Sequence, residues 1–167
     1  MASTINVETP MGIFSILVEQ GAVTKVMLAD PGRHLPYEEI DPLDGELPAR
    51  AASQLVEILS GHQPEKPIPV RLSGTPFQVS VWNQLRKLPV GSTITYTQLA
   101  EAAGHPKASR AVGSAMAANP VPVFVPCHRV LSVNGLGGFA GGLALKRAML
   151  SGEGVEISED GQRSSAP

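Results

Sequence analysis

The sequence has one cysteine, four histidines and seven aromatic residues of the Phe, Tyr and Trp types in 167 positions. A single cysteine forms no internal disulfide and supplies no cysteine-based zinc site, and scattered histidines are a poor basis for a metal cluster. No apolar run approaches the roughly 18 residues that a membrane-spanning helix needs, and the N-terminus has no basic region followed by an apolar run. The composition therefore predicts a cytoplasmic protein with no metal, no cofactor and no membrane contact.

A strong net charge is also absent, because the chain carries −2 at neutral pH. The charge is unevenly distributed, however. Residues 1–70 hold four basic and ten acidic side chains, whereas residues 71–131 hold six basic side chains and one acidic one. A positive field confined to one part of the chain is expected if that part alone meets an anionic backbone. Chance clustering of solvated charges is the alternative.

The lone cysteine, Cys127, follows a segment from Val121 to Pro126 without a polar side chain and is followed directly by His128 and Arg129. A thiol there is either a small buried hydrophobic residue or a nucleophile. A nearby cation or imidazole lowers a thiol pKa of about 8.5 and so favours the reactive thiolate. Because adjacent side chains point apart on a strand or a helix, His128 would act through a water or from a turn.

The first part of the chain predicts a small αβ unit. Short β-rich runs separated by turn residues indicate an antiparallel meander, at residues 5–7, 13–18 and 23–28. An apolar stripe predicts a helix at 47–59, and a further strand is expected at 68–72. This unit contains no catalytic cluster, so we expect it to support the rest. Ser73-Gly74 marks the boundary, which gives a support domain at 1–73, a domain at 74–157 and a disordered tail at 158–167.

The second part predicts helices around the cysteine. Thr75-Pro76-Phe77-Gln78 has the residues of a capping box, with Trp82 expected in the core. Two short helices follow at 95–103 and 106–118, and they fit a helix-turn-helix and an ordinary helical hairpin equally well. A buried strand is expected at 121–124 and a closing helix at 143–151. The glycine-rich segment 135–142 lacks a Walker lysine and is expected to form a flexible pocket wall.

The helix expected at 106–118 is built almost entirely from small residues, and only Lys107 and Arg110 are charged. A sequence-specific DNA reader normally offers several long polar side chains to the base edges. The composition therefore favours close approach of the backbone with little sequence readout. Tight packing against another helix is the alternative.

Four motifs stand in fixed order in this part of the chain: Arg110-Ala111-Val112-Gly113, Ala117-Ala118-Asn119-Pro120, Pro126-Cys127-His128-Arg129-Val130 and Gly138-Phe139-Ala140-Gly141-Gly142. Together they closely resemble the O6-alkylguanine-DNA alkyltransferases, also called methylated-DNA–protein-cysteine methyltransferases. The resemblance is dense from Thr75 to Glu153. It implies an α+β fold, with a small N-terminal αβ domain containing an antiparallel sheet and then a mainly helical DNA-binding domain with a helix-turn-helix. Some family members bind a structural zinc, whose ligands are missing here.

The resemblance implies a single-turnover DNA repair protein. It would rotate O6-alkylguanine, with O4-alkylthymine as a further candidate, out of double-stranded DNA bound through its minor groove, and would transfer the alkyl group irreversibly to Cys127. We expect a monomer in solution and cooperative binding to DNA. Because Cys127 is retained, the inactive branch of the family in which the cysteine is replaced is excluded. The chain also has no room for the transcription factor that is fused to some members.

The resemblance also assigns site residues. His128 would take the thiol proton through a water, Glu153 would orient His128, and Asn119 would brace the turn that holds the cysteine. The flipped base and its alkyl group would meet Tyr96, Pro122, Val130, Phe139 and Ala140. DNA would meet Arg110, which takes the place of the extruded nucleotide, together with Lys107, Ala108, Ser109, Ser114 and Arg129.

Single residues and the whole chain each have an alternative interpretation. Taken alone, Tyr96 is a strand-end aromatic, Glu153 a solvated residue at a helix end and Asn119 a cap. Phe139 and Ala140 stand where family members often have tyrosine followed by serine or glycine, which puts the accepted range of alkyl groups in doubt. The rival functions are a helix-turn-helix regulator that does not need Cys127 and a cysteine hydrolase, for which no oxyanion arrangement is identifiable.

Overall fold

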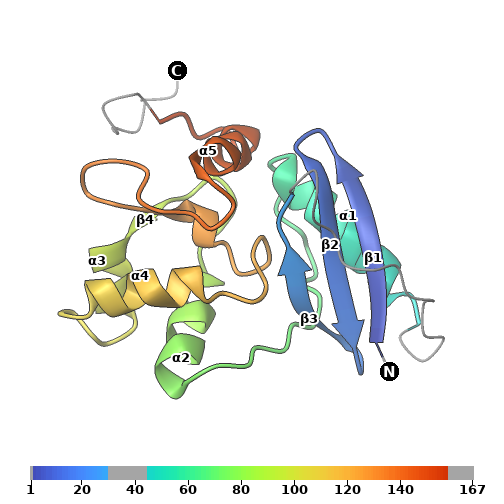
Figure 1. The fold of residues 1–167 in the computed structure, drawn as a ribbon, viewed down its shortest axis with the longest axis horizontal. Helices are drawn as coiled ribbons and strands as arrows, with labels where there is room; N and C mark the ends of the chain where they lie inside the picture. Colours follow the sequence, from blue (N-terminus) through green and yellow to red (C-terminus); the bar gives the residue numbers. More distant parts are fainter. Residues whose placement is uncertain (1, 30–44, 158–167) are drawn as a thin grey trace.

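The computed structural model describes residues 2–29 and 45–157. They form two lobes that lie side by side, one with a sheet and a helix and the other mainly helical (Figure 1). This arrangement confirms the α+β fold class. The predicted disordered tail at 158–167 lies outside the described residues.

The N-terminal lobe contains the predicted meander. Strands β1 (Ala2–Thr9), β2 (Gly12–Glu19) and β3 (Ala22–Met27) pair in sequence order, and both pairs are antiparallel. Gln20 and Gly21 connect β2 to β3 with φ angles of 48° and 78°. Positive φ at both central residues is what a two-residue hairpin turn of type I′ requires, so this dipeptide sets the register of the hairpin.

The strand predicted at 68–72 is wrong, because only one parallel bridge, between Val23 and Val70, joins this segment to the sheet. Val23 donates to the Pro69 carbonyl, and the Arg71 amide donates back to Val23, both at 2.9 Å. Pro67 and Pro69 have no amide hydrogen to donate. The ladder therefore cannot extend.

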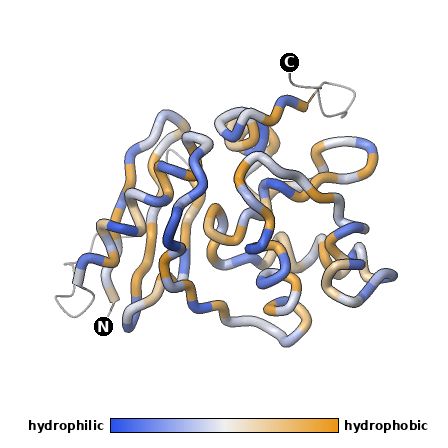
Figure 2. The backbone as a smooth tube through the Cα atoms, turned by 180° about the vertical axis from the view of Figure 1, so that it is seen from behind, coloured by the Kyte–Doolittle hydropathy of each residue, from blue (hydrophilic) through white to orange (hydrophobic). Residues whose placement is uncertain are grey.

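Helix α1 (Leu47–Leu59) packs against β1 and β2. Hydrophilic and hydrophobic residues alternate along it (Figure 2), and the predicted stripe is buried: Leu47, Ala51, Leu55, Ile58 and Leu59. Helical periodicity places these residues on one side, which covers the sheet.

The C-terminal lobe begins with α2 (Pro76–Leu85), and Thr75 and Gln78 form the predicted capping box at its start. Trp82 is buried, and its indole Nε1 donates a hydrogen bond to the Ala115 carbonyl at 2.9 Å. Ala115 belongs to α4 (Ser109–Ala117), so Trp82 ties α2 to the helix that borders the cysteine.

Helix α3 (Tyr96–Ala102) packs against α4, as expected for the two short helices. Their contact contains small and apolar residues buried on both helices, among them Leu99, Ala100 and Val112. Two-residue strands β4 (Ile94–Thr95) and β5 (Val130–Leu131) pair in parallel just before α3. This pairing holds the start of α3 next to the cysteine segment. The use of the helix pair as a helix-turn-helix remains a prediction.

The two lobes share their interior, because buried apolar residues from both belong to one continuous core. Helix α5 (Leu143–Gly152) closes the C-terminal lobe. The division of the chain at residues 73 and 74 stays a prediction. Within residues 2–29 and 45–157, no helix combines the length and the apolar content needed to span a bilayer.

Candidate active site

The segment that leads into Cys127 is a tight turn, so the strand predicted at 121–124 is wrong. The Val125 amide donates to the Val121 carbonyl at 2.9 Å instead of to a neighbouring strand, and prolines at 120, 122 and 126 remove further donors. Val123 has a φ of 77°, a rare conformation for a β-branched residue. Such strain costs about 1–3 kcal/mol. Burial of the Val121, Val123 and Val125 side chains offsets it.

Asn119 holds this turn from both sides. Its Nδ2 donates to the Val125 carbonyl at 2.9 Å, and its Oδ1 accepts from the Val121 amide at 3.0 Å. The 3-10 helix η2 (Cys127–Arg129) begins two residues after Val125. The asparagine therefore bonds to both ends of the turn that leads into the thiol, and its role in bracing Cys127 for reaction stays a prediction.

Asn119→Ala is expected to reduce the free energy of unfolding by about 2–3 kcal/mol, since it leaves one amide and one carbonyl in the turn without their partner. Urea denaturation measures the loss. Asn83→Ala on α2 is the matched control, because Asn83 is exposed. Equal losses for the two variants would contradict the bracing role.

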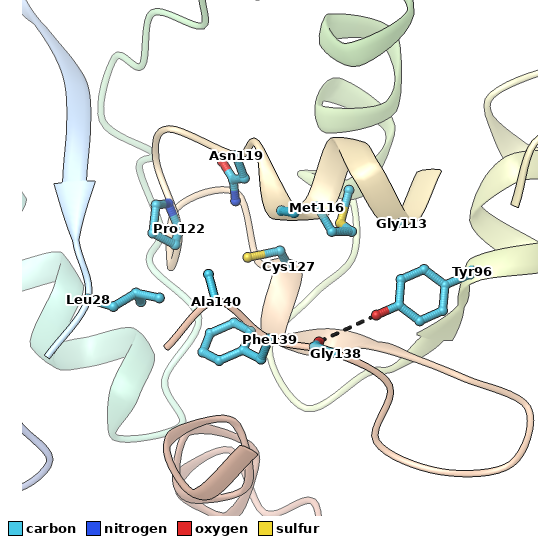
Figure 3. Close-up of a pocket in the computed structure, with 11 residues that line it drawn as sticks. Leu28, Tyr96, Gly113, Met116, Asn119, Pro122, Cys127, Gly138, Phe139 and Ala140 are labelled. Atoms are coloured by element: carbon cyan, nitrogen blue, oxygen red, sulfur yellow. Dashed lines mark hydrogen bonds between the residues drawn. The ribbon is translucent and has the colours of Figure 1, made fainter. Parts of the chain in front are cut away.

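Cys127 lies on the wall of a cavity of about 300 Å³ (Figure 3). Six of the predicted site residues line it: Tyr96, Asn119, Pro122, Cys127, Phe139 and Ala140. Gly138, from the segment 135–142 that was expected to form a pocket wall, also lines it, and four further residues that line it were not predicted: Leu28, Gly113, Met116 and Ala117. The two ends of the cavity differ. The hydroxyl of Tyr96 and the carbonyl of Gly138 lie at one end, and Leu28 lies at the other.

Tyr96 is held at the polar end by the glycine-rich segment. Its hydroxyl donates to the Gly138 carbonyl at 3.4 Å. A Cβ at Gly137 would lie 2.8 Å from that hydroxyl, so only glycine allows this approach. Burial raises the pKa of Tyr96. The hydroxyl therefore remains a hydrogen-bond donor at neutral pH, and the segment predicted as a pocket wall forms one.

Glu153, the residue after α5, lies behind the cysteine and is the centre of a buried cluster. Its Oε2 pairs with His128 Nε2 at 2.5 Å, and its Oε1 accepts from the Gly91 amide at 2.9 Å. Arg129 donates through Nε to Oε1 at 2.7 Å and through NH2 to Oε2 at 3.1 Å. Burial alone would raise the pKa of Glu153, but His128 and Arg129 outweigh it and lower the pKa to about 2.

His128 is fully buried, and burial lowers the pKa of its imidazole despite the adjacent Glu153 carboxylate. A neutral imidazole that donates from Nε2 to Glu153 keeps a lone pair on Nδ1. In the described part of the chain, this Nδ1 is the only buried side-chain nitrogen or oxygen without a hydrogen-bond partner. Nδ1 of His128, the residue after Cys127, is therefore free to accept a hydrogen bond or a proton.

The Cys127 thiol does not have the lowered pKa expected from its neighbours in sequence. Burial raises its pKa, and a hydrogen bond from Asn119 and the charge of Lys146 offset this only in part. The Cys127 residue is only 7% exposed. The resting form is therefore the thiol, and reaction requires removal of its proton.

Lys146 is a functional candidate that the sequence analysis missed. Its ammonium is fully buried and donates to the carbonyls of Val130, at 2.6 Å, of Gly138, at 3.1 Å, and of Leu136. Burial lowers its pKa to about 8. These bonds join α5, β5 and the pocket wall around a positive charge that favours the thiolate of Cys127.

Two of the predicted site residues take different places from those expected. Arg129 is 3% exposed and is engaged by Glu153 and by the Leu88 carbonyl, at 2.9 Å, so it is not available to a DNA phosphate. Val130 donates to the Cys127 carbonyl and accepts from Lys146, and it is not among the residues that line the cavity. We reassign both residues to the support of the site.

The remaining DNA-binding candidates lie on or just before α4. Lys107, Arg110 and Ser114 are exposed, and Ala108 and Ser109 are half-buried. A second hollow, of about 380 Å³, runs beside Arg110 and shares two residues, Tyr96 and Gly113, with the cysteine cavity. Helix α4 therefore borders both hollows, which places its one cation, Arg110, beside the hollow that adjoins the cysteine cavity.

A thiol in an apolar pocket with a histidine–carboxylate pair behind it is typical of proteins that use cysteine as a nucleophile. Comparison with known proteins narrows this class. Residues 76–155 match the family described as "6-O-methylguanine DNA methyltransferase, DNA binding domain". The constitutive methylated-DNA–protein-cysteine methyltransferase of Bacillus subtilis is 37% identical over 162 residues, which cover 91% of this chain and 95% of that protein. The chain belongs to the methylated-DNA–protein-cysteine methyltransferase family.

Other relatives agree with this assignment. The methylated-DNA–protein-cysteine methyltransferase of Methanosarcina acetivorans is 46% identical over 105 residues, 62% of this chain and 67% of that protein. The crystal structure of Mycobacterium tuberculosis OGT in complex with DNA superimposes with a TM-score of 0.77 at 30% identity, covering 90% of this chain and 92% of that one. The similarity therefore extends over both lobes.

Proposed function

We propose that this protein repairs DNA by transferring the alkyl group of O6-alkylguanine to its own Cys127. The observation that carries this proposal is the position of the only cysteine of the chain, on the wall of a cavity with a polar end and an apolar end (Figure 3). The names of the relatives, which refer to methylated DNA and protein cysteine, support it.

The chemistry follows from the groups around the thiol. A water carries the proton of the Cys127 thiol to Nδ1 of His128. The Nε2–H group of His128 keeps its hydrogen bond to the Glu153 carboxylate throughout. The sulfur attacks the alkyl carbon, a sulfur–carbon bond forms, and the bond between that carbon and O6 breaks. The electron pair passes to the guanine, which takes up one proton and leaves unmodified. A proton from Tyr96 or a hydrogen bond from its hydroxyl helps to neutralise the leaving base.

The product explains why each molecule acts once. An alkyl thioether has no acyl or phosphoryl centre for water to attack, and the buried site offers no second thiol to remove the group. Burial also requires that the base leave the helix, since the thiol of a residue that is only 7% exposed cannot reach a base inside the stack. We propose that α4 enters the minor groove, that its small residues allow close approach, and that Arg110 fills the place of the extruded nucleotide.

Intact-mass measurement tests the proposal. The protein is incubated with an excess of duplex carrying one O6-methylguanine, and the same duplex without the methyl group is the control. We expect a gain of one methyl group, saturating at one per molecule, and mass analysis of a proteolytic digest should locate it in the peptide that contains Cys127. No gain on folded protein would overturn the proposal for this substrate, and repeated turnover would favour a hydrolase instead.

A further inference from the structure

The end of β3 brings an N-terminal residue, Leu28, to the cavity wall opposite Tyr96 (Figure 3). The Val26 amide donates to the Pro120 carbonyl at 2.9 Å, which ties this end of the sheet to the turn before Cys127. Leu28, two residues further on, is half-buried and contributes to the core. The N-terminal lobe therefore supplies part of the cavity itself.

The glycine-rich segment leaves room for Leu28. A Cβ at Gly141 would lie 3.0 Å from Leu28 Cδ1 and 2.8 Å from Leu145 Cδ2. Because Gly141 has no side chain, Leu28 can pack directly against the segment that carries Phe139 and Ala140. The Leu28 side chain therefore lies close to the Gly141 backbone and forms part of the cavity wall.

Cys127 lies between the two ends of the cavity. If the base binds at the polar end, near Tyr96 and Gly138, the carbon that reacts lies at the sulfur, and any further carbons of the alkyl group extend toward the apolar end. A methyl group does not reach that end, whereas a longer or bulkier group does. The apolar end contains Leu28, Pro122, Phe139 and Ala140.

We propose that Leu28 limits the size of the alkyl group that the site accepts. This inference rests on the proposed function and gives the N-terminal lobe a direct part in substrate selection. Pro122 has a fixed ring and Ala140 has no carbon beyond Cβ, whereas Leu28 carries a branched side chain from a separate lobe. Its size can therefore change without altering the segment that holds the cysteine.

The test compares rate constants for alkyl transfer from duplexes that carry either O6-methylguanine or O6-benzylguanine. For Leu28→Ala we expect the benzyl-to-methyl ratio to rise about tenfold, and for Leu28→Trp to fall about tenfold, which is typical when the size of an apolar pocket changes by a few carbons. Because both rate constants are measured on the same preparation of a variant, the benzyl-to-methyl ratio does not depend on the fraction of folded protein. Partial misfolding therefore does not hide the result.

Two controls complete the design. Leu28→Ile conserves volume and should leave the ratio unchanged, and Val56→Ala removes carbons from an exposed position on α1 of the same lobe. If neither Leu28→Ala nor Leu28→Trp changes the ratio while the wild type transfers methyl groups, this inference is wrong and the proposed function stands. If the folded wild type transfers neither group, the proposed function fails first.

Discussion

Cys127→Ala is expected to abolish alkyl uptake, with a rate at least about 1,000-fold below that of the wild type. The chain has no other thiol, and no other side chain that lines the cavity is a comparable nucleophile, since the remaining polar ones are the Tyr96 hydroxyl and the Asn119 amide. The Cys127→Ser variant keeps the size of the side chain and a hydrogen-bonding atom near Asn119. It should be equally inactive, because a hydroxyl gives up its proton far less readily than a thiol.

Binding to duplex DNA should survive both substitutions. Cys127 lies inside the lobe, whereas the exposed cations Lys107 and Arg110 are on the surface around α4. Fluorescence anisotropy at one fixed salt concentration is expected to give dissociation constants within about twofold of the wild type. Full alkyl uptake by Cys127→Ala would refute the assignment of the nucleophile. Binding to one defined operator by both proteins, without any uptake, would favour the regulator.

The parts of the fold that were predicted correctly are those in which local sequence decides the structure. The Gln20-Gly21 turn, the capping box at Thr75 and the stripe on α1 each depend on residues that are close in sequence. The strand predictions at 68–72 and 121–124 failed because both segments contain β-branched residues typical of strands but are interrupted by proline. A strand needs a partner and free amides, and in these segments only a turn or a single bridge is possible.

The candidate site shows a similar division. The resemblance to the family implied that Cys127, Asn119 and Tyr96 lie around one pocket and that His128 lies next to Glu153. The direction of a charged side chain could not be predicted in this way. The positive charge of Arg129 suggested a contact with DNA, whereas the fold turns the side chain inward toward Glu153. Packing with residues far apart in sequence decides that direction, and short-range spacing does not contain it.

Lys146 and Leu28, two of the residues that the sequence analysis missed, differ in how much signal they left. Lys146 occupies a buried position on α5 together with Met149 and Leu150. A lysine at helical spacing from an apolar stripe is a recognisable sign of a buried charge. Leu28 left no such sign, since it reaches the cavity only through the contact between the lobes. Its part in the site depends on the hydrogen bond between Val26 and Pro120.

Glu153→Gln is expected to lower both stability and the rate of transfer. Glutamine keeps one acceptor oxygen but loses the charge that pairs with Arg129, and the buried guanidinium is left without a counter-ion. Breaking a buried pair in this way costs about 3–5 kcal/mol. His128 also loses the carboxylate that holds its Nε2–H, so transfer should slow about 100-fold. Glu156→Gln is the matched control, because it removes the same charge from an exposed position three residues later.

The pH dependence separates this electrostatic effect from simple loss of packing. The pKa of Glu153 is lowered from 4.5 to about 2 in the folded protein. The stabilisation from its ionised form is therefore complete above pH 4.5 and is lost as the pH falls toward 2, and it amounts to about 3 kcal/mol at most. Denaturation curves at pH 6 and pH 3 should show that the wild type loses stability over this interval more steeply than Glu153→Gln. The difference in the free energy of unfolding between the wild type and Glu153→Gln should narrow at low pH. A gap that stays constant would mean that glutamine disturbs the shape of the site, and that the charge of Glu153 does not hold the His128–Arg129 cluster together.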